Sequence, residues 1–428
     1  MGFKKHGRTY DIVVFGATGY TGKYTAEHIA AHLPTHLKWA IAGRSRDKLQ
    51  KVADDLKLLN PDRQQPAIEI SNLNDGDLAA LAKKTFILIT TVGPYGRHGE
   101  HAFKACAENG THYFDATGEV PFIARMIKKY DKVAKQTGSM LFPASGVESA
   151  PADLSVWALA KHNRTEFAAK TREVVLSCHK LNSAPSGGTV ASVLEFFDTY
   201  SLKETADAFK PYALSPVPNP ASAQHGLPLR TKLTGLRTVP HLGQLTTFLA
   251  ADTDRATIGR TWGLLSQAGG GGGSARGSEA YGPNFHFSEH MRARNWLSGL
   301  AVHYGIAVSG LLLALLPPLR WLVRRLVYKQ GDGPGREQSQ KDEIEFRGVA
   351  APDTEGPVGK QAFCRTTYLG SMYALTAAFL AHGALTVLED DVDLGGGGVF
   401  TPACLGQGFV DRLDGVGFKI QTESVLTS

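Results

Sequence analysis

The chain has 428 residues, of which 43% are hydrophobic and 20% are charged, and its formal net charge is +6. This length exceeds what one hydrophobic core usually organises, so we expect two domains, and the composition excludes a disordered chain. The basic residues are scattered and form no continuous stripe, so nucleic acid is not an expected partner.

The four cysteines, Cys106, Cys178, Cys364 and Cys404, lie far apart in the sequence and form no Cys-x-x-Cys pair. This spacing argues against a zinc or iron–sulfur site, so no metal site is expected. It also argues against a secreted disulfide framework and favours a reduced, intracellular setting. The first ten residues are polar and basic and contain no signal-peptide core.

Short apolar runs alternate with helix-forming segments over residues 1–150. Residues 11–15 (DIVVF) end at a glycine, as a buried parallel strand does. We expect strands at 11–15, 38–42, 67–70, 86–92, 113–116 and 139–143, and helices at 23–33, 44–59, 74–83, 99–109 and 121–137. This alternation predicts an α/β fold with an N-terminal Rossmann domain, a doubly wound parallel sheet.

The regular alternation of strands and helices ends in residues 151–428, which we assign to a second, α+β domain for substrate binding and dimerisation. A mixed or antiparallel sheet is expected there. The segments that support it are helices at 153–160, 187–198 and 371–382, and strands at 172–181, 242–250 and 362–368.

An apolar segment at residues 296–327 interrupts this second domain. Residues 297–316 are almost free of charge, and ~20 helical residues reach ~30 Å, enough to cross a bilayer. Pro317 and Pro318 then break the helix, and globular patterning resumes at Ile344. We therefore favour a helix or hairpin on a membrane or lipid-droplet surface. A buried core or dimer-interface helix and a true span remain as alternatives.

The loop Gly16-Ala-Thr18-Gly19-Tyr20-Thr21-Gly22 lies between the first expected strand and helix, as a dinucleotide-binding loop does. Gly16 permits the sharp turn, Gly19 lets the backbone approach a pyrophosphate, and Gly22 lets helix and strand pack closely. The helix N-terminus offers free amide groups to the phosphates, and the hydroxyls of Thr18 and Thr21 add donors. We also place Tyr20 in this site.

The second expected strand is followed by Arg44 and Ser45, where an NAD-selective site usually has an acidic residue. A guanidinium and a hydroxyl suit the 2′-phosphate of NADP(H), which we therefore predict as the cofactor. Arg46 is either a further contact or a solvated helix start.

Val92, Gly93, Pro94 and Tyr95 follow the fourth expected strand, at the edge where such sheets bind ligands. We expect the first three to lie along the cofactor and Tyr95 to face the nicotinamide, unless this Gly-Pro segment is only a structural turn.

Asp115 and Glu119 follow the fifth expected strand near the same edge. Either can transfer a proton or cap the helix that begins at Pro121. We favour capping for Glu119, and take Asp115 with Tyr95 as the catalytic candidates.

Six segments resemble the saccharopine dehydrogenase-like oxidoreductase family, which includes the trans-acting enoyl reductases. They are GATGYTG, AGRS, VGPYG, THYFDATGE, PASGVESAPADL and TPACLGQGFVDRL. The resemblance implies a Rossmann domain with an α+β domain, and an apolar segment that associates with membranes or lipid droplets in the eukaryotic relatives. The family's loop glycines match Gly16, Gly19 and Gly22. The chain departs at Thr90 and Thr91, where relatives usually have a cysteine, and at Glu148, where they have an aspartate.

These observations favour an NADPH-dependent reductase of a hydrophobic, lipid- or polyketide-like substrate, free or bound to a carrier. Two alternatives are a catalytically silent nucleotide-binding scaffold at a lipid surface and a saccharopine-type amino-acid dehydrogenase. We expect an intracellular protein at a membrane or lipid droplet, with its nucleotide domain facing the cytosol, and leave a homodimer open.

Overall fold

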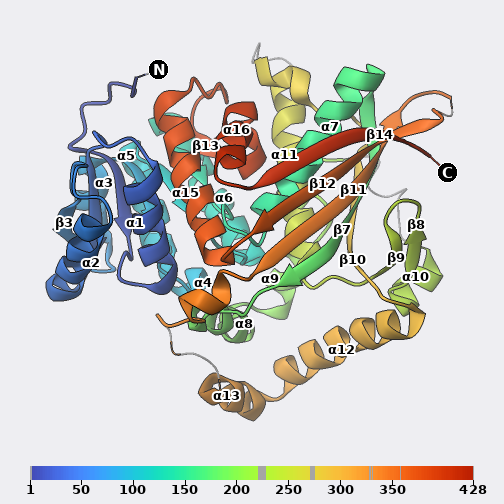
Figure 1. Ribbon diagram of the computed structural model, residues 1–428, viewed down its shortest axis with the longest axis horizontal. Helices are drawn as coiled ribbons and strands as arrows, with labels where there is room; N and C mark the ends of the chain where they lie inside the picture. The colour runs from blue at the N-terminus through green and yellow to red at the C-terminus, as the bar shows by residue number, and fades with distance from the viewer. Residues whose placement is uncertain are drawn as a thin grey trace.

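The computed structural model describes residues 2–219, 228–269, 275–326, 329, 331–356 and 358–427. It contains two seven-stranded sheets that lie beside each other (Figure 1). We call them sheet A and sheet B. The expected α/β fold with a Rossmann domain and a second, mixed sheet is confirmed.

Sheet A is entirely parallel, with strand order β13-β6-β5-β4-β1-β2-β3. Its strands are β1 (Tyr10–Phe15), β2 (Trp39–Gly43), β3 (Ala67–Ile70), β4 (Thr85–Thr90), β5 (His112–Asp115), β6 (Met140–Phe142) and β13 (Gly398–Val399). Five consecutive residues of β1 are buried, because helices cover both faces of the sheet. The chain runs outward from β1 through β2 and β3 and then returns to β4, so its direction reverses between β1 and β4.

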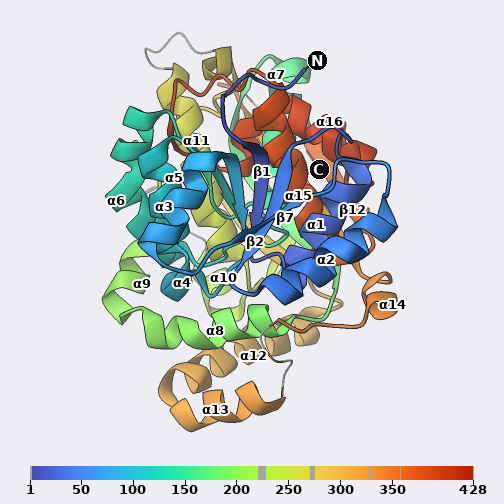
Figure 2. The ribbon, with the colours of Figure 1, turned by 90° about the vertical axis from the view of Figure 1, so that its left-hand side faces the viewer.

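Two layers of helices cover sheet A (Figure 2). One face is covered by α1 (Tyr20–His32), α2 (Arg46–Leu59) and α15 (Met372–Glu389), and the other by α3 (Asp75–Lys84), α5 (Glu100–Asn109) and α6 (Val120–Thr137). Asn74 caps the N-terminus of α3, because its side-chain Oδ1 accepts a hydrogen bond from the Asp77 amide at 2.9 Å. The short α4 (Tyr95–His98) precedes α5.

Late segments of the chain return to sheet A. Helix α15 packs along α1, and β13 pairs with β6 in parallel. The tail continues through the 3₁₀ turn η3 (Pro402–Leu405) and α16 (Gln407–Gly415). Among the described residues, two helices are apolar and long enough to cross a membrane, and α15, one of them, is 83% buried and belongs to the core.

Sheet B is mixed, with strand order β14-β12-β11-β7-β10-β9-β8. Its strands are β7 (Lys170–Asn182), β8 (Arg237–Val239), β9 (Gly243–Thr246), β10 (His286–Arg292), β11 (Glu343–Asp353), β12 (Lys360–Leu369) and β14 (Lys419–Leu426). The long helices α7 (Ala150–Phe167) and α11 (Ala251–Gly269) cover one face. The smaller helices are α8 (Gly187–Thr199), α9 (Leu202–Ala208), α10 (Leu229–Thr234) and α14 (Arg336–Ser339), with the 3₁₀ turn η2 (Ala275–Glu279).

The expected apolar segment forms two helices, α12 (Trp296–Leu315) and α13 (Pro317–Leu326), which extend from the body of the molecule (Figure 1). The break falls before Pro317, as predicted, and residue 327 lies outside the described part. Only 6% of α12 is buried, so the alternative of a helix inside the core of this chain is wrong.

Candidate cofactor and active site

The loops that follow β1, β2, β4, β5 and β6 meet at one edge of sheet A, which we call the carboxyl edge. Doubly wound sheets bind ligands at this edge, where the strand order reverses. Here the reversal lies between β1 and β4, and the two loops are joined there: the Thr91 amide donates to the Phe15 carbonyl at 3.0 Å. The glycine loop and the Val92–Pro94 segment therefore lie side by side, as a cofactor site requires.

The glycine loop tolerates no larger residue at two positions. Gly16 has a φ of +87°, and a Cβ there would lie 2.7 Å from Val92 Cγ2. A Cβ at Gly22 would lie 2.2 Å from the Gly16 carbonyl oxygen. Helix α1 follows Gly19, and no side chain caps its N-terminus. The amides of its first turn remain for an anion, so the loop fits a pyrophosphate.

The other residues predicted in this loop differ in whether their side chains are free to contact a cofactor. Thr18, Gly19 and Thr21 are partly exposed in the turn. The side chain of Tyr20 is already engaged, because its hydroxyl donates to the Pro334 carbonyl at 2.7 Å and its ring packs edge-on against Tyr373. Tyr20 thus connects α1 to the loop before α14, and only its backbone remains for a cofactor.

Arg44 and Ser45 follow β2 at the same edge. Arg44 is exposed, and in the described ranges no carboxylate pairs with it. Ser45 precedes α2, and its hydroxyl makes no capping hydrogen bond. Both groups are therefore available to a 2′-phosphate.

Glu119 fixes the turn after β4. Its carboxylate accepts hydrogen bonds from the Tyr95 amide at 2.7 Å, the Gly96 amide at 3.0 Å and the Tyr200 hydroxyl at 2.7 Å. Capping was expected for this residue, but at the helix near Pro121; the structure places the cap on α4 instead, because Glu119 lies against that helix in space.

Tyr95 is buried beneath this turn. Its hydroxyl donates to the Thr90 carbonyl at 3.2 Å and accepts from the Ala116 amide at 3.3 Å. Burial raises the pKa of the phenol well above its usual value. Val92 and Gly93 are partly exposed, whereas Pro94 is buried and follows a cis peptide bond.

Asp115, the other catalytic candidate, is completely buried at the end of β5. Its Oδ1 accepts from the amides of Thr117 and Ala144, and its Oδ2 accepts from the Tyr113 hydroxyl at 2.6 Å. Burial raises the pKa of Asp115 to about 6. These bonds hold the loops after β5 and β6 together. The catalytic roles of Tyr95 and Asp115 stay predictions.

Comparison with known proteins agrees with this geometry. The sequence profile described as the saccharopine dehydrogenase NADP-binding domain matches residues 12–142. A provisionally named trans-acting enoyl reductase of Mycobacterium tuberculosis is 32% identical, and the trans-acting enoyl reductase of Mycobacterium leprae is 31% identical; each match covers 97% of this chain and 98% of the relative. The chain belongs to the saccharopine dehydrogenase-like oxidoreductase family.

The fold of the family extends across both sheets. Apo saccharopine dehydrogenase (L-Glu forming) from Saccharomyces cerevisiae aligns over 97% of this chain and 100% of its own, with a TM-score of 0.53 and 12% identity. Membership of the family, shown by the profile and by the relatives, makes the chain an oxidoreductase whose Rossmann domain binds NADP(H).

In this oxidoreductase the structure adds two carboxylates that the sequence analysis missed. Asp254 in the first turn of α11 and Glu289 in the middle of β10 are 0% and 6% exposed. None of their four carboxylate oxygens has a hydrogen-bond donor in the described part of the protein. A signal was present in the run Phe287-x-Glu289-x-Met291, where an acid occupies an otherwise apolar face of a strand.

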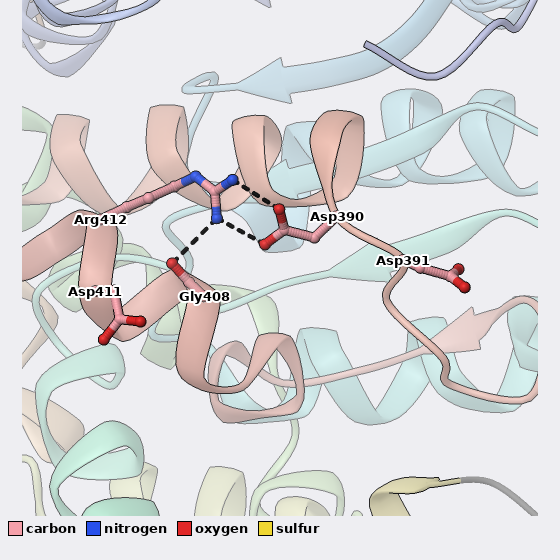
Figure 3. Close-up of a pocket in the computed structure, with 5 residues that line it drawn as sticks. All are labelled: Asp390, Asp391, Gly408, Asp411 and Arg412. Atoms are coloured by element: carbon pink, nitrogen blue, oxygen red, sulfur yellow. Dashed lines mark hydrogen bonds and ion pairs between the residues drawn. The ribbon is translucent and has the colours of Figure 1, made fainter. Parts of the chain in front are cut away.

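A shallow pocket elsewhere does not suit the cofactor. It lies between the end of α15 and α16 and is lined by Asp390, Asp391, Gly408, Asp411 and Arg412 (Figure 3). Both amino groups of the Arg412 guanidinium donate to Asp390 at 2.7 Å, so its charge is already balanced. Three acidic side chains would repel the phosphates, so this pocket does not change the assignment to the carboxyl edge.

Proposed function

We propose that the protein reduces an activated carbon–carbon double bond in a hydrophobic, lipid- or polyketide-like substrate, with NADPH as reductant. Relatives named trans-acting enoyl reductases match over nearly their whole length, which supports this reaction class. The observation that carries the proposal is the position of α8. It packs on α4 at the carboxyl edge on one side and on α12 and α13 on the other, and so connects the cofactor site to the apolar helices.

The residues of this chain hold and orient the reactants. The glycine loop binds the pyrophosphate, and Arg44 with Ser45 binds the 2′-phosphate. Ser192 of α8 lies over Gly93, with its Oγ 3.8 Å from where a Cβ would lie, so α8 covers this part of the edge and excludes water. The bound cofactor supplies the hydride.

A cofactor-oxidation screen tests this proposal. We expect NADPH oxidation with α,β-unsaturated thioesters or hydrophobic enones, none with their saturated counterparts, and little with saccharopine. NADPH binding without oxidation of any substrate would favour the silent scaffold, and robust turnover of saccharopine would favour the amino-acid dehydrogenase.

We also propose that α12 and α13 dock the protein on a membrane or lipid-droplet surface. Trp296, Leu311 and Leu315 are 56%, 58% and 67% exposed, and Gly299 alone is buried among the residues of α12. On α13 the guanidinium of Arg325 stacks over Trp321, a pairing that suits the boundary between lipid headgroups and acyl chains. An exposed apolar surface of this extent is costly in water.

The strand pairing supports a surface helix over a single crossing. β10 precedes α12, β11 follows α13, and both pair with β7. One crossing would place two strands of the same sheet on opposite sides of the bilayer. We therefore propose that α12 and α13 enter from one side, with the nucleotide domain in the cytosol.

Vesicle flotation tests the docking. We expect Leu311→Glu with Leu315→Glu to abolish flotation with phospholipid vesicles while NADPH affinity stays unchanged. The matched control is Leu202→Glu on α9, a leucine that is 87% exposed outside this surface. Continued flotation of the double variant contradicts the proposal. A dimer in sedimentation that the double variant abolishes, without vesicle binding by the parent, would assign α12 to a homodimer interface.

A further inference from the structure

Asp254 and Glu289 form a buried acid pair where α11 packs on β10. The helix and the strand pack on each other, and the two carboxyl groups interact electrostatically. Two ionised carboxylates can only accept hydrogen bonds, and no donor serves any of the four oxygens in the described residues. The contact is therefore favourable only when one of the two groups carries a proton.

The surroundings of the pair also favour a bound proton. The groups that face it are Cys178 of β7, Ser149 before α7 and Glu148 in the loop after β6, and none of these is a cation. Burial raises the pKa of Glu289 to about 7 and that of Asp254 well above its usual value. The pair thus holds one proton at neutral pH.

Glu148 connects this pair to the carboxyl edge. Its carboxylate lies against Gly118 in the loop after β5, where a Cβ would come within 2.1 Å of it, and it interacts electrostatically with Glu119 and Asp254. The side chain of Glu148 is exposed to solvent. Solvent and substrate can therefore reach Glu148 but not the pair behind it.

We propose that Glu148 is the proton donor of the reduction and that Asp254 and Glu289 resupply its proton. This inference rests on the reduction proposed above. One alkene carbon receives the hydride from NADPH. The π electrons of the alkene form a bond to the proton at the adjacent carbon, and the O–H bond of the Glu148 carboxyl breaks. While the substrate shields Glu148 from solvent, the acid pair reprotonates it. After the product leaves, a proton from water returns to the pair through Glu148, so one NADPH and one proton are consumed for each double bond reduced.

Glu148→Gln tests the donor. We expect it to lower kcat by about 100-fold or more, the usual contribution of a general acid, with NADPH affinity unchanged. The amide keeps the shape of the side chain but provides no acidic proton. A kcat within a few-fold of the parent overturns the assignment of Glu148.

Glu289→Gln and Asp254→Asn test the relay, and the amide group in each lets the pair keep a hydrogen bond. We expect the group that titrates near pH 7 to disappear from the pH profile of kcat, with KM nearly unchanged. The matched control is Glu345→Gln, because Glu345 is also buried but hydrogen bonds from Arg365 and Arg347 hold its pKa below the usual range despite its burial. The relay is supported if the control keeps the parent's pH profile of kcat while both relay variants lose the group near pH 7. It is refuted if the relay variants keep the parent's pH profile.

An infrared titration without substrate separates the two proposals. Loss of protonated carboxyl absorbance near pH 7 in Glu289→Gln and in Asp254→Asn, but not in Glu345→Gln, supports the shared proton even if no enoyl substrate is reduced. Burial raises the pKa of Asp153 to about 7, so its own band persists in all three variants. Reduction of an enoyl substrate with this absorbance unchanged in both relay variants leaves the proposed function intact and refutes the acid pair.

Discussion

The glycine loop at the carboxyl edge of sheet A and the group of three acids, Glu148, Asp254 and Glu289, are built differently. The loop consists of seven consecutive residues whose backbone forms the binding surface. The acids come from a loop, a helix and a strand that only the fold brings together. A site made of local backbone can thus be recognised in a sequence, whereas a site made of distant side chains cannot.

The largest expected effect is on the local site. We expect Gly22→Val to abolish measurable NADPH binding, because its Cβ would lie 2.2 Å from the Gly16 carbonyl oxygen and force the loop apart. Calorimetry with NADPH measures the loss, and circular dichroism checks that the variant is folded. The control is Gly76→Ala, at a position where the nearest atom is at an ordinary 3.5 Å. Unchanged NADPH affinity in Gly22→Val would show that the glycine loop does not form the cofactor site.

The sequence predicted the first six strands of sheet A because short, largely apolar segments alternate there with helix-forming segments. Boundaries were less accurate: the first helix was expected at residue 23 but begins at Tyr20, since the glycine loop itself forms its first turn. β13 was missed, because a two-residue strand leaves no periodic pattern.

The cofactor residues were proposed for the same local reason and stay predictions. Nothing in the sequence indicates that the side chain of Tyr20 is engaged, since its partners at Pro334 and Tyr373 are more than 300 residues away in the chain. The enclosure of Tyr95 depends on Glu119 and Ala116, and no rule of spacing indicates it. Long-range side-chain contacts, and not secondary structure, account for what the sequence did not reveal.

The second-largest expected effect concerns the stability that Asp115 contributes. It bears on the comparison because only some hydrogen-bond partners of Asp115 lie near it in the sequence. Its pKa is raised in the fold, so the native state binds the proton more tightly than the unfolded state, and stability is lost as pH rises from about 4 to about 6. Two pKa units correspond to about 3 kcal/mol. We expect Asp115→Asn to lack this loss, which denaturant unfolding at a series of pH values measures. If the free energy of unfolding depends on pH in the same way in parent and variant, ionisation of Asp115 does not destabilise the fold.

The smallest effect concerns cofactor selectivity. We expect Arg44→Ala to weaken NADPH binding by about 1.5–3 kcal/mol, the contribution of a hydrogen bond to a charged group, and to leave NADH affinity nearly unchanged. Lys51→Ala, at an exposed lysine further along α2, serves as the control, and paired calorimetric titrations with the two nucleotides provide the measurement. Equal losses for both nucleotides would place the 2′-phosphate elsewhere.

The pairing of β13 with β6 has a consequence for synthesis on the ribosome. Residues 10–142 emerge early, but β6 is left as an open sheet edge until the strand near residue 398 follows, and α15, which covers α1, is translated only shortly before it. An open edge is a template for unwanted pairing. The nascent nucleotide domain therefore keeps this edge open for most of translation, and we expect a premature stop before residue 398 to release a product prone to aggregate.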